Sequence, residues 1–203
     1  MKLKDKQRPA VPQMEPGSYI GVCVGVYGVG EQETSWNEKT KYREEIILVF
    51  EIPDEKIEYE GELKPRQLSR TFTATTSDKG GLRKFLKDWR GQDFSSEEEM
   101  GDFELTSLLG NGAMIAVTVN EKGYANIGSA IPLPRGVSAP QTDTVLLAFD
   151  VDEWNDDAFN LLPAWVQEKI KNSSQYKRDH APDVEVDFQD AVNQGAEKAV
   201  APF

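Results

Sequence analysis

The segment Ser18–Gly30 constrains the fold more than any other part of the chain. Large β-branched and aromatic residues alternate in it with glycines at Gly21, Gly25, Gly28 and Gly30. Glycine inside a strand marks a bulge or a sharp bend, because it tolerates backbone conformations that a side chain would forbid. We therefore expect one long, bent first strand, of the kind that joins both halves of a small closed barrel.

The elements that follow predict a mainly β domain with short helices. A second strand over Tyr42–Ile52 is expected to end in a turn at Pro53-Asp54, and the polar and apolar residues of Arg66–Thr76 alternate as in a third strand. Ser77 or Asp78 would cap a helix that runs to Trp89, and a short second helix is expected around Glu97–Glu99 and Phe103–Leu109. Two further strands are expected over Ala113–Asn120 and Tyr124–Leu133.

This order, three strands, a helix and two strands, predicts a five-stranded OB-fold-like Greek-key barrel with a helix between strands three and four, plus a C-terminal helical extension. Four regions follow: a flexible lead-in over 1–16, the barrel over 17–136, an accessory strand and helical segment over 137–172, and a disordered acidic tail over 173–203. Residues 145–150 would add a strand or an apolar patch. The apolar residues of the accessory segment would either pack on the barrel or mediate self-association; they are Trp154, Phe159, Leu161, Leu162, Trp165 and Ile170.

The charge is unevenly distributed along the chain. The net charge is −12, but the residues from Gln141 onward hold 13 acidic and 5 basic side chains, against 22 and 18 before it. The front domain therefore has enough Lys and Arg for a local basic face, which an acidic tail can screen. No apolar run approaches the ~18 residues of a membrane span, and nothing reads as a secretory signal. The lone Cys23 lies in a strand, as expected for a buried, reduced thiol in the cytoplasm.

The C-terminal residues resemble the end of bacterial single-stranded DNA-binding proteins. An acidic stretch containing Asp183, Glu185, Asp187 and Asp190 precedes a terminal Ala201-Pro202-Phe203. The resemblance implies that Pro202 and Phe203 fill an apolar pocket of a replication or recombination protein while the acids meet its basic rim. A disordered terminus that ends in Phe by chance is the alternative.

Motifs over residues 16 to 172 also resemble a family of bacteriophage-encoded single-stranded DNA-binding proteins. The resemblance implies an OB-like domain that binds single-stranded DNA during phage replication or recombination, in the cytoplasm of the host. Its segments are Pro16–Tyr19, Leu82–Gly91, Leu108–Gly110, Tyr124–Ile127, Leu133–Gly136 and Leu162–Ile170.

Single strands are held by basic grooves and by aromatic rings on which bases stack. On an OB-fold the candidates lie on strands two and three and in the two flanking loops. They are Trp36, Lys39, Lys41, Tyr42 and Arg43 at the first loop, Arg66, Arg70 and Phe72 on strand three, and Lys122 and Tyr124 in the last hairpin. Trp36 has local packing as its alternative, and Phe72 is favoured as core. Arg83, Lys84, Lys87 and Arg90 would extend the phosphate path, or form a solvated helix face.

Catalysis, cofactors and metals are not expected. His180 is the only histidine, in a polar stretch, so His-based triads and multi-His metal sites are excluded. No phosphate-binding glycine loop stands between a strand and a helix. The class that competes with DNA binding is a protein–protein adaptor or structural module on the same barrel, for which the acidic balance would be natural. Self-association is compatible with either class.

Overall fold

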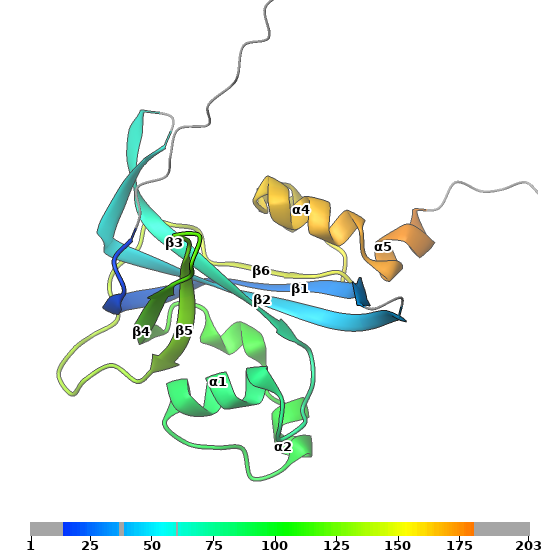
Figure 1. Cartoon of the computed structure of the whole chain (residues 1–203), viewed down its shortest axis with the longest axis horizontal. Coiled ribbons are helices and arrows are strands. Elements are labelled where there is room, and N and C mark those ends of the chain that lie inside the picture. The colour runs from blue at the N-terminus through cyan, green and yellow to red at the C-terminus, as the bar shows by residue number, and fades with distance from the viewer. Residues whose placement is uncertain (1–13, 37–38, 60, 181–203) are drawn as a thin grey trace, which may run out of the picture.

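The computed structural model describes residues 14–36, 39–59 and 61–180 and is mainly β (Figure 1). Its strands form one sheet in the order β3-β2-β1-β4-β5, antiparallel throughout, and a sixth strand, β6, pairs in parallel with β1. β4 and β6 follow each other along the same edge of β1, β4 at Gly17–Val22 and β6 at Gly25–Gly28. The bounds are β1 Gly17–Trp36, β2 Lys39–Tyr59, β3 Glu62–Thr73, β4 Gly112–Val119, β5 Ala125–Ile131 and β6 Leu147–Asp150.

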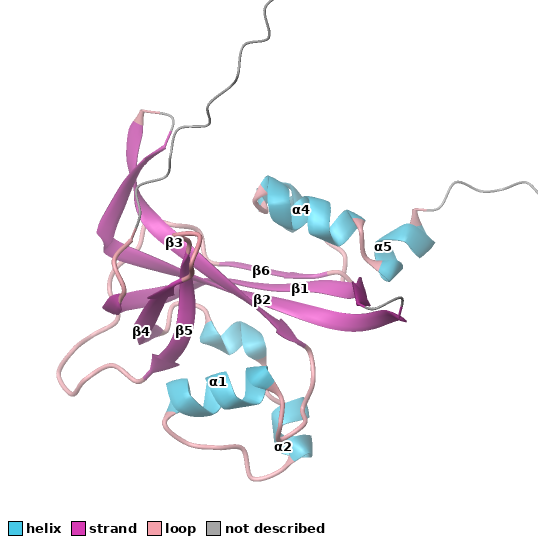
Figure 2. Cartoon of the chain, viewed as in Figure 1, coloured by secondary structure: helices cyan, strands magenta, loops and turns pink. Residues whose placement is uncertain are grey.

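Short helices lie in two groups on opposite sides of this sheet (Figure 2). One group connects β3 to β4, and the other follows β6. The first comprises α1 (Gly81–Arg90), α2 (Glu97–Gly101) and the 3-10 helix η1 (Leu105–Leu108); the second comprises α3 (Asp156–Leu161), α4 (Ala164–Lys171) and α5 (Ser174–Asp179). None of the helices in these described segments is long and apolar enough to cross a membrane.

The glycines of β1 mark bulges, as the sequence predicts. The pairing of β1 with β2 shifts register between Cys23 and Gly25 and again between Gly28 and Gly30. At the second shift Gly30 has a φ of +74°, and a Cβ there would lie 2.9 Å from the side chain of Val151. Only glycine adopts this conformation without strain and admits the chain packed above it.

The central parts of β1 and β2, at 22–27 and 47–52, are buried on both faces, so the molecule has two cores. The inner core lies between the sheet and α1, where the Phe50 and Trp89 rings are 5.0 Å apart and the Phe72 and Phe85 rings 4.9 Å. The outer core lies under β6, α3, α4 and α5. Its buried members are Val22, Val24, Tyr27, Val29, Ile47, Val49, Phe149, Val151, Phe159, Leu162, Val166 and Ile170. The helical part of the accessory segment thus packs on the sheet, and its exposed large apolar residues are Leu161 and Trp165. Val137, Val145 and Leu146, in the stretch before β6, are exposed as well.

Several predicted boundaries are wrong. β2 does not turn at Pro53 but continues to Tyr59, with the irregularity confined to the stretch between Ile52 and Lys56. Proline has no N–H for the ladder, and a local break in pairing accommodates it. The α1 helix begins at Gly81 rather than after Ser77, whose carbonyl instead accepts a turn hydrogen bond from the Gly80 N–H.

Two short helices, α2 and η1, stand where one was expected, and α5 lies in a stretch expected to be disordered. α5 is ordered through contacts distant in sequence. The Tyr176 ring lies 5.6 Å from the Trp154 ring, and the Glu31 N–H donates to Gln175 Oε1 at 2.8 Å.

The hydrogen-bonded sheet is open at its two ends. Across the described residues no ladder joins β3 to β5, so a closed five-stranded barrel is not confirmed. A side chain spans the gap instead: Arg70 Nη1 on β3 donates to the carbonyl oxygens of Ile127 and Gly128 on β5. The Arg70 guanidinium also lies over the Phe72 ring, 4.9 Å from its centroid. Burial lowers the pKa of Arg70, which nevertheless remains a cation at neutral pH.

Candidate nucleic-acid interface

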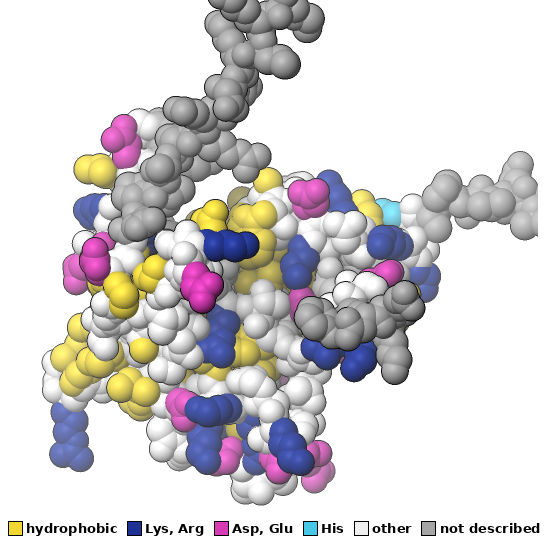
Figure 3. Space-filling view, viewed as in Figure 1, with side chains coloured by type: hydrophobic (Ala, Val, Ile, Leu, Met, Phe, Trp, Pro, Cys, Tyr) yellow, Lys and Arg dark blue, Asp and Glu magenta, His cyan; other side chains and the backbone are white. Residues whose placement is uncertain are grey.

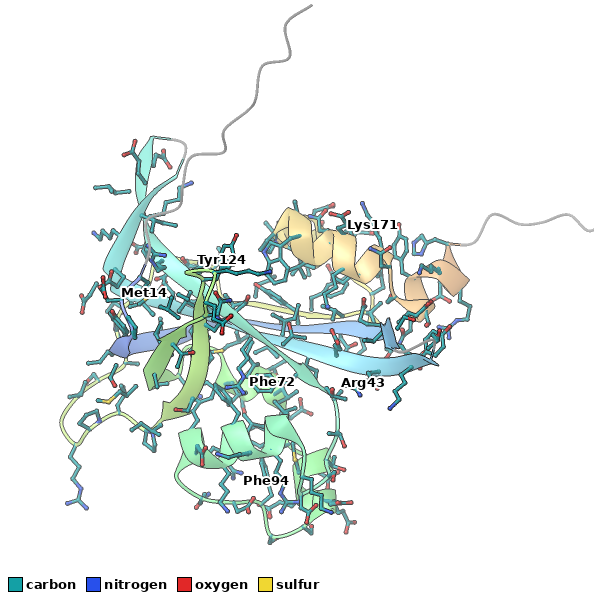
Figure 4. All side chains as sticks on the ribbon, viewed as in Figure 1. Met14, Arg43, Phe72, Phe94, Tyr124 and Lys171 are labelled. Carbon is teal, nitrogen blue, oxygen red and sulfur yellow. The ribbon has the colours of Figure 1, made fainter. Side chains whose placement is uncertain are left out.

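The hairpin of β1 and β2 collects the first-loop candidates. Lys41 pairs with Thr34, Tyr42 with Glu33 and Arg43 with Gln32. Because side chains alternate along a strand, Lys41 and Arg43 share one face and Tyr42 points to the other. All three are exposed, Tyr42 by 54%. Figure 4 places Arg43 toward the free end of this hairpin.

Trp36 and Lys39 pair with each other through their backbones at the end of the same hairpin. The structure describes the backbones of these two residues but not their side chains. Their assignment to DNA binding therefore stays a prediction.

The β4–β5 hairpin presents a second cation beside an aromatic ring. Asn120 Oδ1 accepts hydrogen bonds from the backbone N–H groups of Lys122 and Tyr124, both at 3.0 Å, and Gly123 turns the chain with a φ of +81°. Asn120 and backbone hydrogen bonds thus hold the turn, and the Lys122 side chain takes no part in these bonds. The Tyr124 ring is 67% exposed (Figure 4).

β3 lies in the sheet next to β2 and presents an exposed polar row. The row consists of Gln67, Ser69, Thr71 and Thr73, one residue in two along the strand. Hydroxyl and amide groups of this kind hydrogen-bond phosphate oxygens and bases without discriminating strongly between sequences.

The other β3 candidates are not on this surface. Phe72 is only 5% exposed and packs in the inner core, which corrects its inclusion among stacking residues. Arg66 is buried, and Arg70 is occupied in bridging β3 to β5. Phe72 and Arg70 support the surface from beneath rather than form it.

The basic residues of α1 are engaged within the protein. Arg83 is buried; its Nη2 donates to the Phe94 carbonyl at 2.7 Å, and its Nε lies 3.2 Å from Asp93 Oδ1. Lys87 Nζ lies 3.0 Å from the other oxygen of Asp93.

The remaining two cations of α1 are engaged as well. Lys84 Nζ pairs with Asp88 at 2.9 Å, and the Arg90 guanidinium lies 4.1 Å from the centre of the Phe94 ring. The densest basic cluster in the sequence is therefore largely neutralised or packed. It offers little to a phosphate chain.

The hairpin cations are different. Among the described residues, Lys41, Arg43 and Lys122 take part in none of the ion pairs. Figure 3 shows Lys and Arg side chains spread in separate positions over the face in view, with apolar surface between them. Spaced cations with intervening apolar surface suit a flexible single strand, whose phosphates and bases both need partners.

The carboxylate of Glu51 is buried, with the residue only 1% exposed, and was not among the residues predicted from the sequence. Glu51 Oε1 accepts from Thr142 Oγ1 at 2.6 Å, Oε2 accepts from Thr144 Oγ1, and Gln67 Nε2 lies 3.4 Å away. This carboxylate fastens the linker between β5 and β6 to the sheet. Its burial could have been predicted from the alternation of side chains along β2, which places Glu51 on the same face as Ile47 and Val49.

Two further observations bear on chemistry. Burial raises the pKa of the Cys23 thiol to about 12, so it stays protonated at neutral pH. Within the described ranges no three His, Cys, Asp or Glu side chains are grouped so as to hold a metal ion. The tail candidates, Asp183, Glu185, Asp187, Asp190, Pro202 and Phe203, lie outside the described residues.

Comparison with known proteins supplies no relative: no family model, no curated protein and no solved structure matches this chain.

Proposed function

We propose that this protein binds single-stranded DNA without strong sequence preference, through the face bounded by the β1–β2 and β4–β5 hairpins. One observation carries the proposal. The two hairpins carry three exposed cations, Lys41, Arg43 and Lys122, that form no ion pair among the described residues. The same hairpins carry the exposed rings of Tyr42 and Tyr124, with Tyr42 on the other side of its strand from Lys41 and Arg43. Cations attract the phosphates, and the rings accept any base, because every base has a π-face.

The proposed fold behind this face is an OB-like barrel. Three features support it: the strand order, the position of α1 between β3 and β4, and the Arg70 contacts that draw the two open ends of the sheet together. In OB-folds the first-to-second and fourth-to-fifth strand loops flank the binding face. Those loops correspond to the two hairpins here.

The proposed setting is phage replication or recombination, with the tail as a recruiting element. In this proposal Pro202 and Phe203 enter an apolar pocket of a replication or recombination protein, and the preceding acids meet its basic rim. Deletion of residues 181–203 would abolish that recruitment but leave the DNA-binding face intact.

The test is a fluorescence-anisotropy titration with a labelled ~30-nucleotide oligo-dT and a duplex of equal length, each at two salt concentrations. Binding to the single strand that weakens with salt, with little duplex binding, is expected. Absence of single-strand binding at low salt, in the full chain and in a variant without residues 181–203, would overturn the proposal. The variant is needed because acids in the tail compete with DNA for the same cations.

A second candidate, a protein–protein adaptor, is favoured by a specific feature of the surface. Leu161 and Trp165 are 64% and 49% exposed on α3 and α4. Loss of DNA binding in the titration, together with capture of a defined partner that Trp165→Ala abolishes, would establish the adaptor instead.

A further inference from the structure

A groove with an apolar floor and an acidic rim lies between the α2–η1 segment and β6 with α3. Its cavity, of about 620 Å³, is bounded by β1 and β2, by the segment from α2 to η1, and by β6 with α3. Val26, Ile46 and Phe149 contribute to its apolar surface. A second cavity of about 460 Å³ shares Ile46 and Phe103 with it and extends toward α1.

The groove carries an excess of negative charge. Its four charged lining residues are all acidic: Asp102, Glu104, Asp150 and Glu153. None of the four takes part in an ion pair among the described residues. Burial raises the pKa of Asp150 above its usual range.

The acidic environment extends to Glu44, beside the groove. Burial, followed by the charges of Asp152, Asp150 and Glu31, raises its pKa as well. Cationic side chains in the groove would relieve this repulsion.

One wall of the groove is an unpaired strand edge. β6 pairs with β1 along one side only, and no ladder occupies its other side within the described part of the chain. Three consecutive β6 residues, Ala148, Phe149 and Asp150, line the groove. An extended segment can therefore pair with the free edge of β6 as an additional strand. Its alternate side chains would then face the apolar floor and the acidic side chains of the groove.

The chain itself contains a segment with the required pattern. In Lys2-Leu3-Lys4-Asp5-Lys6, three lysines stand at alternate positions, and Met1 and Leu3 occupy the positions between them. In an extended conformation the lysines share one face and the two apolar residues the other. This segment lies outside the described residues, so its complementarity is argued from sequence.

We infer that the acidic groove binds Lys2–Lys6 of a second copy of this chain. Reach favours the second copy over the same one. Lys4 stands ten residues before Met14, a span of at most ~33–36 Å. The chain enters the sheet at Gly17, and the groove residues Val26 and Gly28 lie further along β1, at most about 30–36 Å away at the rise of a straight strand. A segment of the same copy can occupy the groove only within this reach of Met14, whereas the segment of a second copy has no such limit.

Such a contact is head-to-tail, because the segment and the groove are different surfaces of one chain. Heterologous contacts of this kind build rings or open chains. The inference is independent of the proposed DNA binding, since none of the side chains proposed to contact DNA lines the groove. If both hold, copies bound to one strand would also contact one another.

Sedimentation velocity of the full chain without DNA tests the inference, over a wide concentration range and at low and high salt. A sedimentation coefficient that rises with protein concentration is expected, with the rise reduced by salt. Glu104→Lys should abolish the rise. Glu98→Lys, an exposed acid on α2 outside the groove, is the matched control and should leave it unchanged.

A charge exchange identifies the occupant. Lys4→Glu alone should abolish self-association, and Lys4→Glu combined with Glu104→Lys in one chain should restore at least half of it. A full chain that stays monomeric at all concentrations would overturn the inference. Self-association that survives Glu104→Lys, or that the charge exchange fails to restore, would also overturn it and would place the contact elsewhere. DNA binding, measured separately, is expected to be unchanged in all these variants.

Discussion

On α1, Arg83 and Lys87 share the carboxylate of Asp93, and Lys84 reaches Asp88, whereas Lys41, Arg43 and Lys122 on the two hairpins reach no carboxylate among the described residues. The two regions contain the same kinds of side chain in opposite settings. α1 has the higher density of basic residues in the sequence, yet its cations stabilise the loop that follows the helix. The availability of a cation for a phosphate thus depends on its partners, and the count of Lys and Arg does not reveal it.

The largest expected effect is on the free energy of unfolding and concerns the buried cation of α1. Arg83→Met should lower the free energy of unfolding by about 2–3 kcal/mol, because the variant leaves the Phe94 carbonyl and Asp93 without their buried cationic donor. Urea titration measures the loss. Lys84→Met, which removes an exposed pair, is the control and should change stability by less than about 0.5 kcal/mol. Equal losses in both variants would break the distinction between buried and exposed cations on α1.

The next effect concerns the rings of the hairpins. Tyr42→Ala and Tyr124→Ala should each weaken oligo-dT binding by about 1–3 kcal/mol, because each ring offers one stacking platform. Anisotropy titration at fixed salt gives the change. Trp165→Ala, which removes an exposed ring from α4, should leave the affinity unaltered. A loss in the Trp165 variant as large as in the tyrosine variants would show that the binding face lies elsewhere.

A smaller effect is expected on the salt dependence of DNA binding. Arg43→Gln and Lys41→Gln should each reduce the slope of log affinity against log salt by about 0.7, since each removes one phosphate contact to a single strand. Titrations at four or more salt concentrations measure the slope. Lys84→Gln should not change it, because that cation is already paired with Asp88. If the Lys84 variant alone lowers the slope, the phosphate path runs over α1.

The smallest expected effect is the pH dependence of the α1 cluster. Hydrogen bonds from Lys87 and, less strongly, from Arg83 hold the pKa of Asp93 below its usual range. Because the pKa of Asp93 is lower in the folded state, its charge stabilises the fold above the unfolded pKa of about 3.9. This stabilisation is lost as the pH falls through the folded-state pKa. Asp93→Asn should therefore lower the melting temperature at pH 7 and change it little near pH 2. A difference that is equally large at both pH values would contradict this role of the charge.

Much of the sheet follows from local sequence pattern. The bulges of β1 follow from Gly25 and Gly30, whose placement between large residues is visible without any knowledge of tertiary contacts. The N-terminal cap of α3 is equally local, since Asn155 Oδ1 accepts from the Ala158 N–H at 2.9 Å. Such features depend on neighbouring residues and can be predicted from them.

Features that depend on distant partners could not be predicted. Arg83 looks solvent-exposed beside the apolar stripe of α1, and only the fold brings the Phe94 carbonyl over it. α5 is too short to be a stable isolated helix, and the contact between Tyr176 and Trp154 orders it. Pro53 suggests a turn, but β2 pairs with β3 on both sides of it and the strand continues.

In the candidate site, too, some features follow from local sequence and others depend on distant partners. Alternation along β3 separates Gln67, Ser69, Thr71 and Thr73 from Phe72, and the structure bears out that separation. Which cations stay unpaired could not be read from the sequence, because the pairs of Arg83 and Lys87 with Asp93 form across a loop. Proximity of the β4–β5 hairpin to β3 depends on Arg70, a contact 57 residues apart in the chain.

The most direct test of the central claim is ultraviolet cross-linking of the full chain to oligo-dT, with the linked peptides identified by mass spectrometry. If the two hairpins bind the single strand, cross-links are expected in peptides that contain Tyr42 and Tyr124, and an excess of unlabelled single strand should abolish them. Cross-links confined to peptides of α1, around Lys84 and Lys87, would contradict the claim, because those cations would then bind DNA in spite of their carboxylate partners.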